Sequence, residues 1–149
     1  MFNEKWDLRF LELVKHMSTW SKDESTKVGC AIVGSNKEIL SCGYNGFARG
    51  VDDTIPSRSL RPEKYLWTEH AERNAIFNAA RIGVCLQGSI LYSTLCPCMD
   101  CARAVVQCGI VRVVTVKPNN DRIQEIWKEQ LSRVEELFQE CGVELAIYN

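Results

Sequence analysis

Two short motifs contain the side chains of this sequence that are best suited to bind a metal ion. Residues 70–72 read His-Ala-Glu, and residues 97–101 read Pro-Cys-Met-Asp-Cys. Cys98 and Cys101 are three residues apart, about one helical turn, so both sulfurs project from the same helix face. One imidazole and two thiolates leave a fourth tetrahedral zinc position free, which is typical of a catalytic site. We therefore predict that His70, Cys98 and Cys101 bind one zinc ion.

Glu72 is the candidate for moving protons at this site. Zinc lowers the pKa of a bound water toward 7, and the resulting hydroxide can attack the carbon of an amidine group. A carboxylate beside the metal can take the proton from the water and deliver protons to a ring nitrogen and a departing amine. On a regular helix, however, His70 and Glu72 would point about 200° apart. We therefore predict that the site lies where the helix begins.

Each motif alone has other interpretations. A Cys-x-x-Cys pair also occurs as a redox pair, in structural metal sites and by chance, and a His-x-Glu pair alone carries little information. His16, the second histidine of the chain, lies among apolar residues of a predicted helix, which favours a structural role. The two motifs in this order match the signature of zinc-dependent deaminases. A non-enzymatic module that uses the same three ligands to stabilise its fold is the alternative.

Composition and charge restrict the class of protein. The chain has 149 residues, of which 46% are hydrophobic and 25% are charged, as expected for one globular domain. Its apolar runs are far shorter than the roughly 20 residues that span a membrane, and its first residues lack the apolar centre of a signal peptide. We therefore expect a cytoplasmic protein with no membrane partner, in which the eight cysteines are mostly reduced. The net charge of −1 argues against binding to long nucleic acids.

Hydrophobic periodicity predicts the elements that position the two motifs. Helical spacing is found at residues 3–20, 69–81, 98–107 and 121–140. Strands are predicted at residues 28–33, 38–44, 89–94, 110–116 and 143–148. Single helices between strands imply parallel pairing, helices on both faces and a ligand site beyond the carboxyl ends of the strands. The intervening loop at residues 45–67 is long enough to suggest a function.

The motifs and the segments around them resemble the deoxycytidylate (dCMP) deaminase family of the cytidine deaminase-like superfamily. The resemblance extends over nearly the whole chain, through residues 21–23, 28–33, 43–47, 61–65, 70–76 and 97–101. It implies a single α/β domain over residues 1–149, with three layers and a five-stranded mixed sheet flanked by helices. It also implies hydrolysis of dCMP to dUMP and ammonia, which supplies dUMP for thymidylate synthesis.

The same resemblance implies residues that bind the substrate. Asn45 matches the residue that binds the deoxyribose, and its amide can both donate to and accept from a hydroxyl, although Asn-Gly is also a strong turn signal. Ser21 and Lys22 match contacts to the phosphate, and Ala71 matches a residue of the substrate pocket. Further cations that could bind a phosphate lie in the long loop, at Arg58, Arg61 and Lys64.

Regulation and assembly are also implied by the resemblance. Gly46, Phe47 and Arg49 lie in the segment that holds an effector nucleotide in regulated members, and Arg81 matches an arginine tied to the effector response. Position 48 is Ala where the family usually has Pro. The expected effectors are dCTP, with Mg²⁺ as its companion, and dTTP. The expected assembly is a homo-oligomer between dimer and hexamer.

Several alternatives stay open within this class. The long loop lacks the extra Cys or His of members that bind a second zinc, so one zinc per subunit is expected. Cys96 directly precedes the Pro-Cys motif, and we interpret it as a wall of the pocket. Other substrates are dCTP, a 5-substituted dCMP or a free base, and an RNA-editing enzyme is a further alternative.

Overall fold

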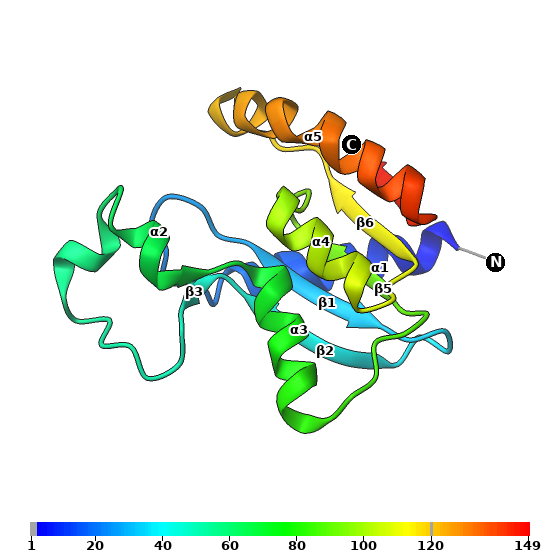
Figure 1. Cartoon of the computed structure of the whole chain (residues 1–149), viewed down its shortest axis with the longest axis horizontal. Helices are drawn as coiled ribbons and strands as arrows, with labels where there is room; N and C mark the ends of the chain where they lie inside the picture. The colour runs from blue at the N-terminus through cyan, green and yellow to red at the C-terminus, as the bar shows by residue number, and fades with distance from the viewer. Residues whose placement is uncertain (1–2, 120) are drawn as a thin grey trace.

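Five strands form one mixed sheet in the computed structural model, which describes residues 3–119 and 121–149 (Figure 1). The strand order is β2-β1-β5-β6-β7. The strands are β1 (Gly29–Val33), β2 (Ile39–Tyr44), β5 (Ile90–Ser93), β6 (Arg112–Val116) and β7 (Glu144–Tyr148). Each lies within one or two residues of a predicted strand, because buried apolar runs bounded by turn residues mark strands well.

The parallel pairing expected for strands separated by single helices is confirmed for β5, β6 and β7, and the turn at residues 34–37 makes β1 and β2 a hairpin. β5, β6 and β7 are parallel neighbours, whereas β1 pairs antiparallel with both β2 and β5. The strands joined through a helix, β2, β5, β6 and β7, do all run in one direction. The tight turn after β1 makes a hairpin with β2, however, and places β1 between β2 and β5. The mixed five-stranded sheet implied by the resemblance is thereby confirmed.

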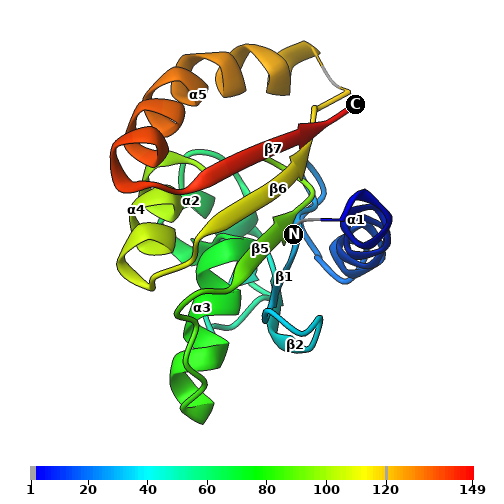
Figure 2. The same ribbon diagram turned by 90° about the vertical axis from the view of Figure 1, so that its right-hand side faces the viewer.

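Helices cover both faces of the sheet, which gives the three predicted layers (Figure 2). α1 (Glu4–Ser18) lies alone on one face, and Asn3 caps it by accepting from the N–H of Lys5. The opposite face carries α3 (Ala71–Ile82), α4 (Met99–Gln107) and α5 (Asp121–Cys141). Among the described residues, no helix combines the length and the apolar character needed to cross a membrane.

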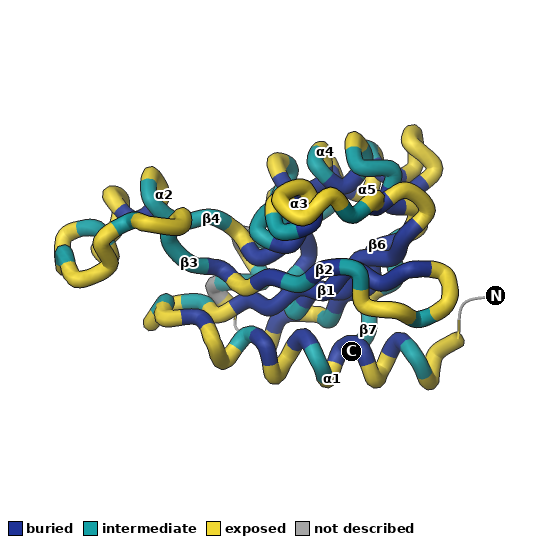
Figure 3. Tube along the Cα trace, turned by 90° about the horizontal axis from the view of Figure 1, so that it is seen from below, coloured by how far each residue is buried: buried dark blue, intermediate teal, exposed yellow. Residues whose placement is uncertain are grey.

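The segment predicted as a loop at residues 45–67 contains short elements. β3 (Gly46–Phe47) pairs antiparallel with β4 (Thr68–Glu69), which closes the segment at its base. Between them lie a 3₁₀ turn (Pro56–Ser59) and α2 (Lys64–Trp67). The segment projects from the body and is largely exposed (Figures 1 and 3). Periodicity could not predict these elements, because each is shorter than two helical turns or one ordinary strand.

Gly43 allows β2 to approach the first turn of α3 closely. A Cβ atom at this position would lie 2.5 Å from the backbone N of Ala75 and 2.6 Å from the carbonyl oxygen of Ala71. The side chains of Asn74 and Asn78 strengthen this contact by donating to the carbonyls of Tyr44 and Cys42. These contacts fix the start of α3 near the carboxyl ends of β2, β5 and β6.

Candidate active site

The predicted metal ligands lie at the starts of two neighbouring helices. His70 is the N-cap of α3 and has extended backbone angles, φ −75° and ψ 155°. Cys98 is the N-cap of α4, also extended, and Cys101 lies in the first turn of that helix. The non-helical backbone of His70 removes the 200° separation from Glu72 that a regular helix would impose. The position predicted from the spacing, at the beginning of the helix, is confirmed.

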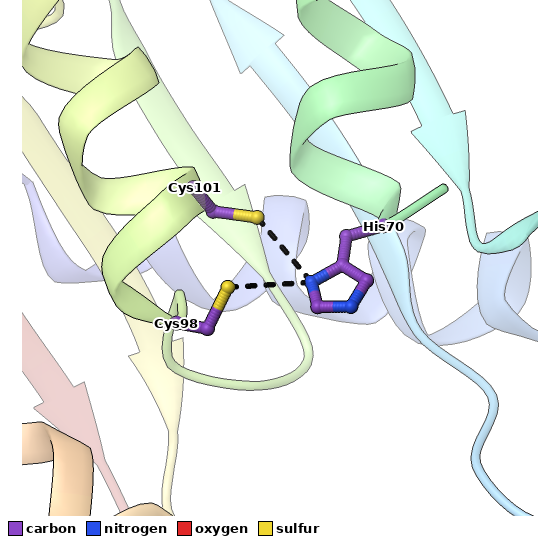
Figure 4. A group of neighbouring side chains, drawn as sticks. All are labelled: His70, Cys98 and Cys101. Carbon is purple, nitrogen blue, oxygen red and sulfur yellow. Dashed lines mark hydrogen bonds between the residues drawn. The ribbon is translucent and has the colours of Figure 1, made fainter. Parts of the chain in front are cut away.

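The three side chains converge on one point (Figure 4). Nδ1 of His70 lies 3.4 Å from the sulfur of Cys98 and 3.5 Å from the sulfur of Cys101. Ligands at the usual zinc distances in a tetrahedral arrangement would have nitrogen and sulfur about 3.5 Å apart. The residues therefore fit a zinc ion bound through Nδ1. No other such cluster of His, Cys, Asp and Glu occurs in the described part of the chain.

The protonation of the cluster suits metal binding. A hydrogen bond from Cys101, with a second from His70, lowers the pKa of Cys98 to about 4. The bond to Cys98 raises the pKa of His70 to about 9, and the Cys98 contact and burial raise the pKa of Cys101. At neutral pH Cys98 is therefore the thiolate of the cluster, and His70 and Cys101 carry the protons. Because zinc binds thiolates and neutral imidazole, its binding would release these protons.

Glu72 lies beside the cluster. Its side chain is 4% exposed, with Oε2 3.6 Å from the sulfur of Cys101 and Oε1 3.5 Å from the hydroxyl of Ser93. Burial raises the pKa of this carboxyl above its ordinary value. A buried carboxylate that does not belong to the ligand set can exchange protons next to the metal, as general acid–base chemistry requires.

Comparison with known proteins identifies the family. Residues 4–117 match the family described as the cytidine and deoxycytidylate deaminase zinc-binding region. The chain belongs to this family. It is a zinc-binding deaminase, as the two motifs predicted, and the resemblance to the deoxycytidylate deaminase family is confirmed as well.

Relatives of the deaminase family match nearly the whole chain. An uncharacterized deaminase of Aliivibrio fischeri, encoded in the luxG 3′ region, is 38% identical over 141 residues, which cover 95% of this chain and 92% of the relative. The deoxycytidylate deaminase of Mus musculus is 33% identical over 93% of this chain and 77% of its own. The dCMP deaminase of cyanophage S-TIM5, in complex with dCMP and dUMP, is 26% identical with a TM-score of 0.78, covering 99% of this chain and all of its own.

Two cavities open near the site of this deaminase. The larger, about 460 Å³, is lined at the metal site by His70 and Cys98, and its other walls come from α4 and α5: Met99, Asp100, Glu129, Gln130 and Arg133. The smaller, about 240 Å³, lies at the sheet edge where β1 begins and β5 and β6 end. Its lining consists of Ser25, Thr26, Lys27, Val28, Thr94, Leu95, Pro118, Asn119 and Ile123.

The residues predicted to bind the substrate surround the start of β1. Asn45 is buried, and its amide accepts from the N–H of Val28 and donates to the carbonyl of Thr26, both at 2.8 Å. Ser21 is buried and donates to the carbonyl of Asn45. Ala71 is fully buried as the first residue of α3. Lys22 is exposed and forms an ion pair with Asp53 in the projecting segment.

The residues predicted to bind an effector are distributed along β3 and α3. Gly46 and Phe47 form β3, and Arg49 donates a hydrogen bond to Asn78 of α3. Arg81 is exposed at the end of the same helix, three residues beyond Asn78. Positions three apart on a helix are neighbours, so Arg81 lies one turn from the Arg49 contact.

Three residues near the zinc site were not predicted as part of it. Ser93, the last residue of β5, contacts Glu72, and Gln130 accepts from the backbone of α4. Trp127 of α5 contacts Cys96, whose pKa burial raises to about 12. A polar residue at the end of a buried strand was a signal for Ser93. Nothing local marks Gln130 or Trp127, because their neighbours lie about 30 residues away along the chain.

Proposed function

We propose that the protein catalyses the hydrolysis of dCMP to dUMP and ammonia. The mouse relative is named for this activity, and the cyanophage relative is described with dCMP and dUMP bound. The observation that carries the proposal is the buried carboxylate of Glu72, 3.6 Å from the sulfur of Cys101 and outside the ligand set. Zinc bound by these three residues would keep a fourth position for water, and Glu72 would lie next to it as a proton carrier.

The reaction needs two proton transfers, and Glu72 is placed to perform both. His70, Cys98 and Cys101 would hold the zinc ion, which would supply a nucleophile at neutral pH by lowering the pKa of a water. As the water oxygen bonds to the amino-bearing carbon of the pyrimidine, Glu72 takes a proton and passes it to the adjacent ring nitrogen. It then carries the second proton to the amino group, which leaves as ammonia. The hydroxyl of Ser93, 3.5 Å away, helps to orient the carboxylate.

A substrate panel tests the proposal directly. Rates are measured with dCMP, dCTP, 5-methyl-dCMP, deoxycytidine and free cytosine at matched concentrations. We expect dCMP to have the highest kcat/KM. Equal activity on deoxycytidine, without a gain from the phosphate, would contradict the choice of substrate and leave the zinc deaminase intact. Higher activity on dCTP or 5-methyl-dCMP would establish the corresponding alternative.

We also propose that the smaller cavity holds the sugar and phosphate of the substrate. Hydrogen bonds from the N–H of Leu95 to Ser93 and from Ser93 to Glu72 link its wall to the catalytic carboxylate. Lys27 lines this cavity and forms no salt bridge within the described chain. Lys22 and Lys64 are instead paired with aspartates.

The two exposed lysines can be distinguished by substitution. We expect Lys27→Ala to raise the KM for dCMP by about tenfold or more, since a hydrogen bond to a charged group is worth about 1.5–3 kcal/mol. Lys22→Ala should have a smaller effect because a phosphate must compete with Asp53 for its ammonium group. Steady-state kinetics with dCMP and deoxycytidine measure both effects. If Lys22→Ala alone raised the KM for dCMP, the phosphate would be assigned to Lys22, as the resemblance implies.

We also propose that nucleotides regulate the enzyme. We propose that the enzyme is a homo-oligomer in the cytoplasm. A nucleotide along β3 and α3 would find cationic side chains at Arg49 and Arg81. We expect dCTP with Mg²⁺ to increase activity at low dCMP concentration and dTTP to decrease it. Initial rates and light scattering, each with and without the effectors, test regulation and assembly. Identical rate curves under all conditions would exclude regulation but not catalysis.

A further inference from the structure

The start of α4 is supported by a residue of α5. The first four N–H groups of a helix have no partner within it. One of them, the N–H of Met99, donates to Oε1 of Gln130 at 3.1 Å. Cys98, the N-cap of α4, makes no capping hydrogen bond through its side chain. Gln130 therefore acts as a cap supplied by another helix, at the peptide that directly follows a zinc ligand.

The two cysteines of the site differ in how firmly their surroundings fix them. Cys101 is fully buried within the first turn of α4, so packing and helical geometry hold its side chain. Cys98 is only partly buried and precedes the first helical residue, with φ −69° and ψ 170°. A rotation of the peptide between Cys98 and Met99 would move the Cys98 thiolate relative to Nδ1 of His70. Gln130 restrains this peptide through the Met99 N–H.

We propose that Gln130 is a positioning residue of the zinc site, which orients the Cys98 thiolate by holding the N–H of Met99. This role depends on the zinc site and is independent of the identity of the substrate. Residues that orient metal ligands without touching the metal typically change metal affinity by 10- to 100-fold when they are replaced. Such residues usually bind the side chain of the metal ligand, whereas Gln130 binds the peptide N–H that directly follows Cys98.

The test compares three variants of the full chain. Gln130→Leu removes the acceptor at similar size, whereas Gln130→Glu keeps an acceptor oxygen at the helix N-terminus. Gln124→Leu is the matched control, because Gln124 lies on the same helix and donates to the carbonyl of Pro118, away from α4. The zinc Kd of each variant is measured by competition with a chelator. Denaturant unfolding in the presence of EDTA shows that each variant is folded.

We expect Gln130→Leu to weaken zinc binding by about tenfold or more, with Gln130→Glu and Gln124→Leu within about threefold of the wild type. A wild-type zinc Kd for Gln130→Leu would overturn the proposal. An equal loss in Gln130→Glu would also overturn it, because packing and not the acceptor would then be responsible. A higher KM for dCMP with unchanged zinc Kd would assign Gln130 to the substrate instead. Because zinc binding is measured without substrate, these results are separate from the test of dCMP hydrolysis.

Discussion

Replacing Glu72 with Gln is expected to lower kcat for dCMP by at least about a hundredfold, while zinc stays bound. Glutamine has nearly the same shape, so the site should keep its packing, but an amide cannot take a proton from the attacking water. The metal should remain because His70, Cys98 and Cys101 converge without the carboxylate. The measurement pairs steady-state kinetics with the zinc content of the purified variant, which should equal one per chain.

A second carboxylate provides the control for charge alone. Glu69 lies three residues before Glu72 and forms an ion pair with Arg73, so Glu69→Gln removes the same charge near the site. We expect its kcat to stay within about threefold of the wild type, because long-range charge is screened near the surface. Unchanged turnover in Glu72→Gln would instead indicate a zinc module without catalysis by Glu72. Loss of the metal would indicate that Glu72 is itself a ligand.

The metal site was predictable from the sequence because its geometry is largely local. Three-residue spacing places Cys98 and Cys101 on one face of whatever helix they begin. The spacing of His70 and Glu72 is incompatible with a shared site in mid-helix, which leaves the start of α3 as the place for His70. Both inferences require only helical periodicity and the chemistry of zinc ligands. The apolar runs of the strands are similarly local, so their number and approximate bounds could be predicted.

Features that depend on contacts between distant segments were not predictable. β1 lies between β2 and β5 because of the way in which the β1–β2 hairpin joins the rest of the sheet. The apolar pattern of β1 would be the same whether β1 or β2 were the neighbour of β5. The amide of Asn45 was predicted to bind a hydroxyl, yet it also holds the backbone on both sides of Lys27. The ion pair of Lys22 joins residues 31 positions apart. The residues next to Lys22 or Asn45 in the sequence do not indicate which distant residues they contact.

Replacing Arg112 with Met is expected to destabilise the fold by about 3–5 kcal/mol, because it leaves the buried carboxylate of Asp7 without its charged partner. Asp7 and Arg112 are 1% and 4% exposed and form two hydrogen bonds, at 2.8 and 2.9 Å. The hydroxyls of Tyr92 and Tyr148 also donate to Asp7, which joins α1 to three strands of the sheet. Urea unfolding at pH 7 in the presence of excess zinc measures the loss. Arg103→Met, which breaks an exposed pair with Asp100, should cost no more than about 1 kcal/mol.

The loss of stability in Arg112→Met could come from the unpaired charge of Asp7 or from lost packing. Its dependence on pH distinguishes these two causes. Burial alone would raise the pKa of Asp7, but hydrogen bonds from Arg112 and the two tyrosines lower it below the ordinary 3.8. The wild-type pair therefore contributes stability that is present above pH 3.8 and is lost as the pH falls through the lower folded pKa. Without Arg112, Asp7 loses the hydrogen bonds and the positive charge that contribute to lowering its pKa, so this pKa rises relative to the wild type, and protonation relieves the unpaired charge as the pH falls. The difference between variant and wild type should therefore be largest near pH 7 and shrink toward pH 3. A difference that is constant with pH would mean that Arg112 stabilises the fold through packing, and the double variant Asp7→Leu/Arg112→Met would then be no more stable than Arg112→Met.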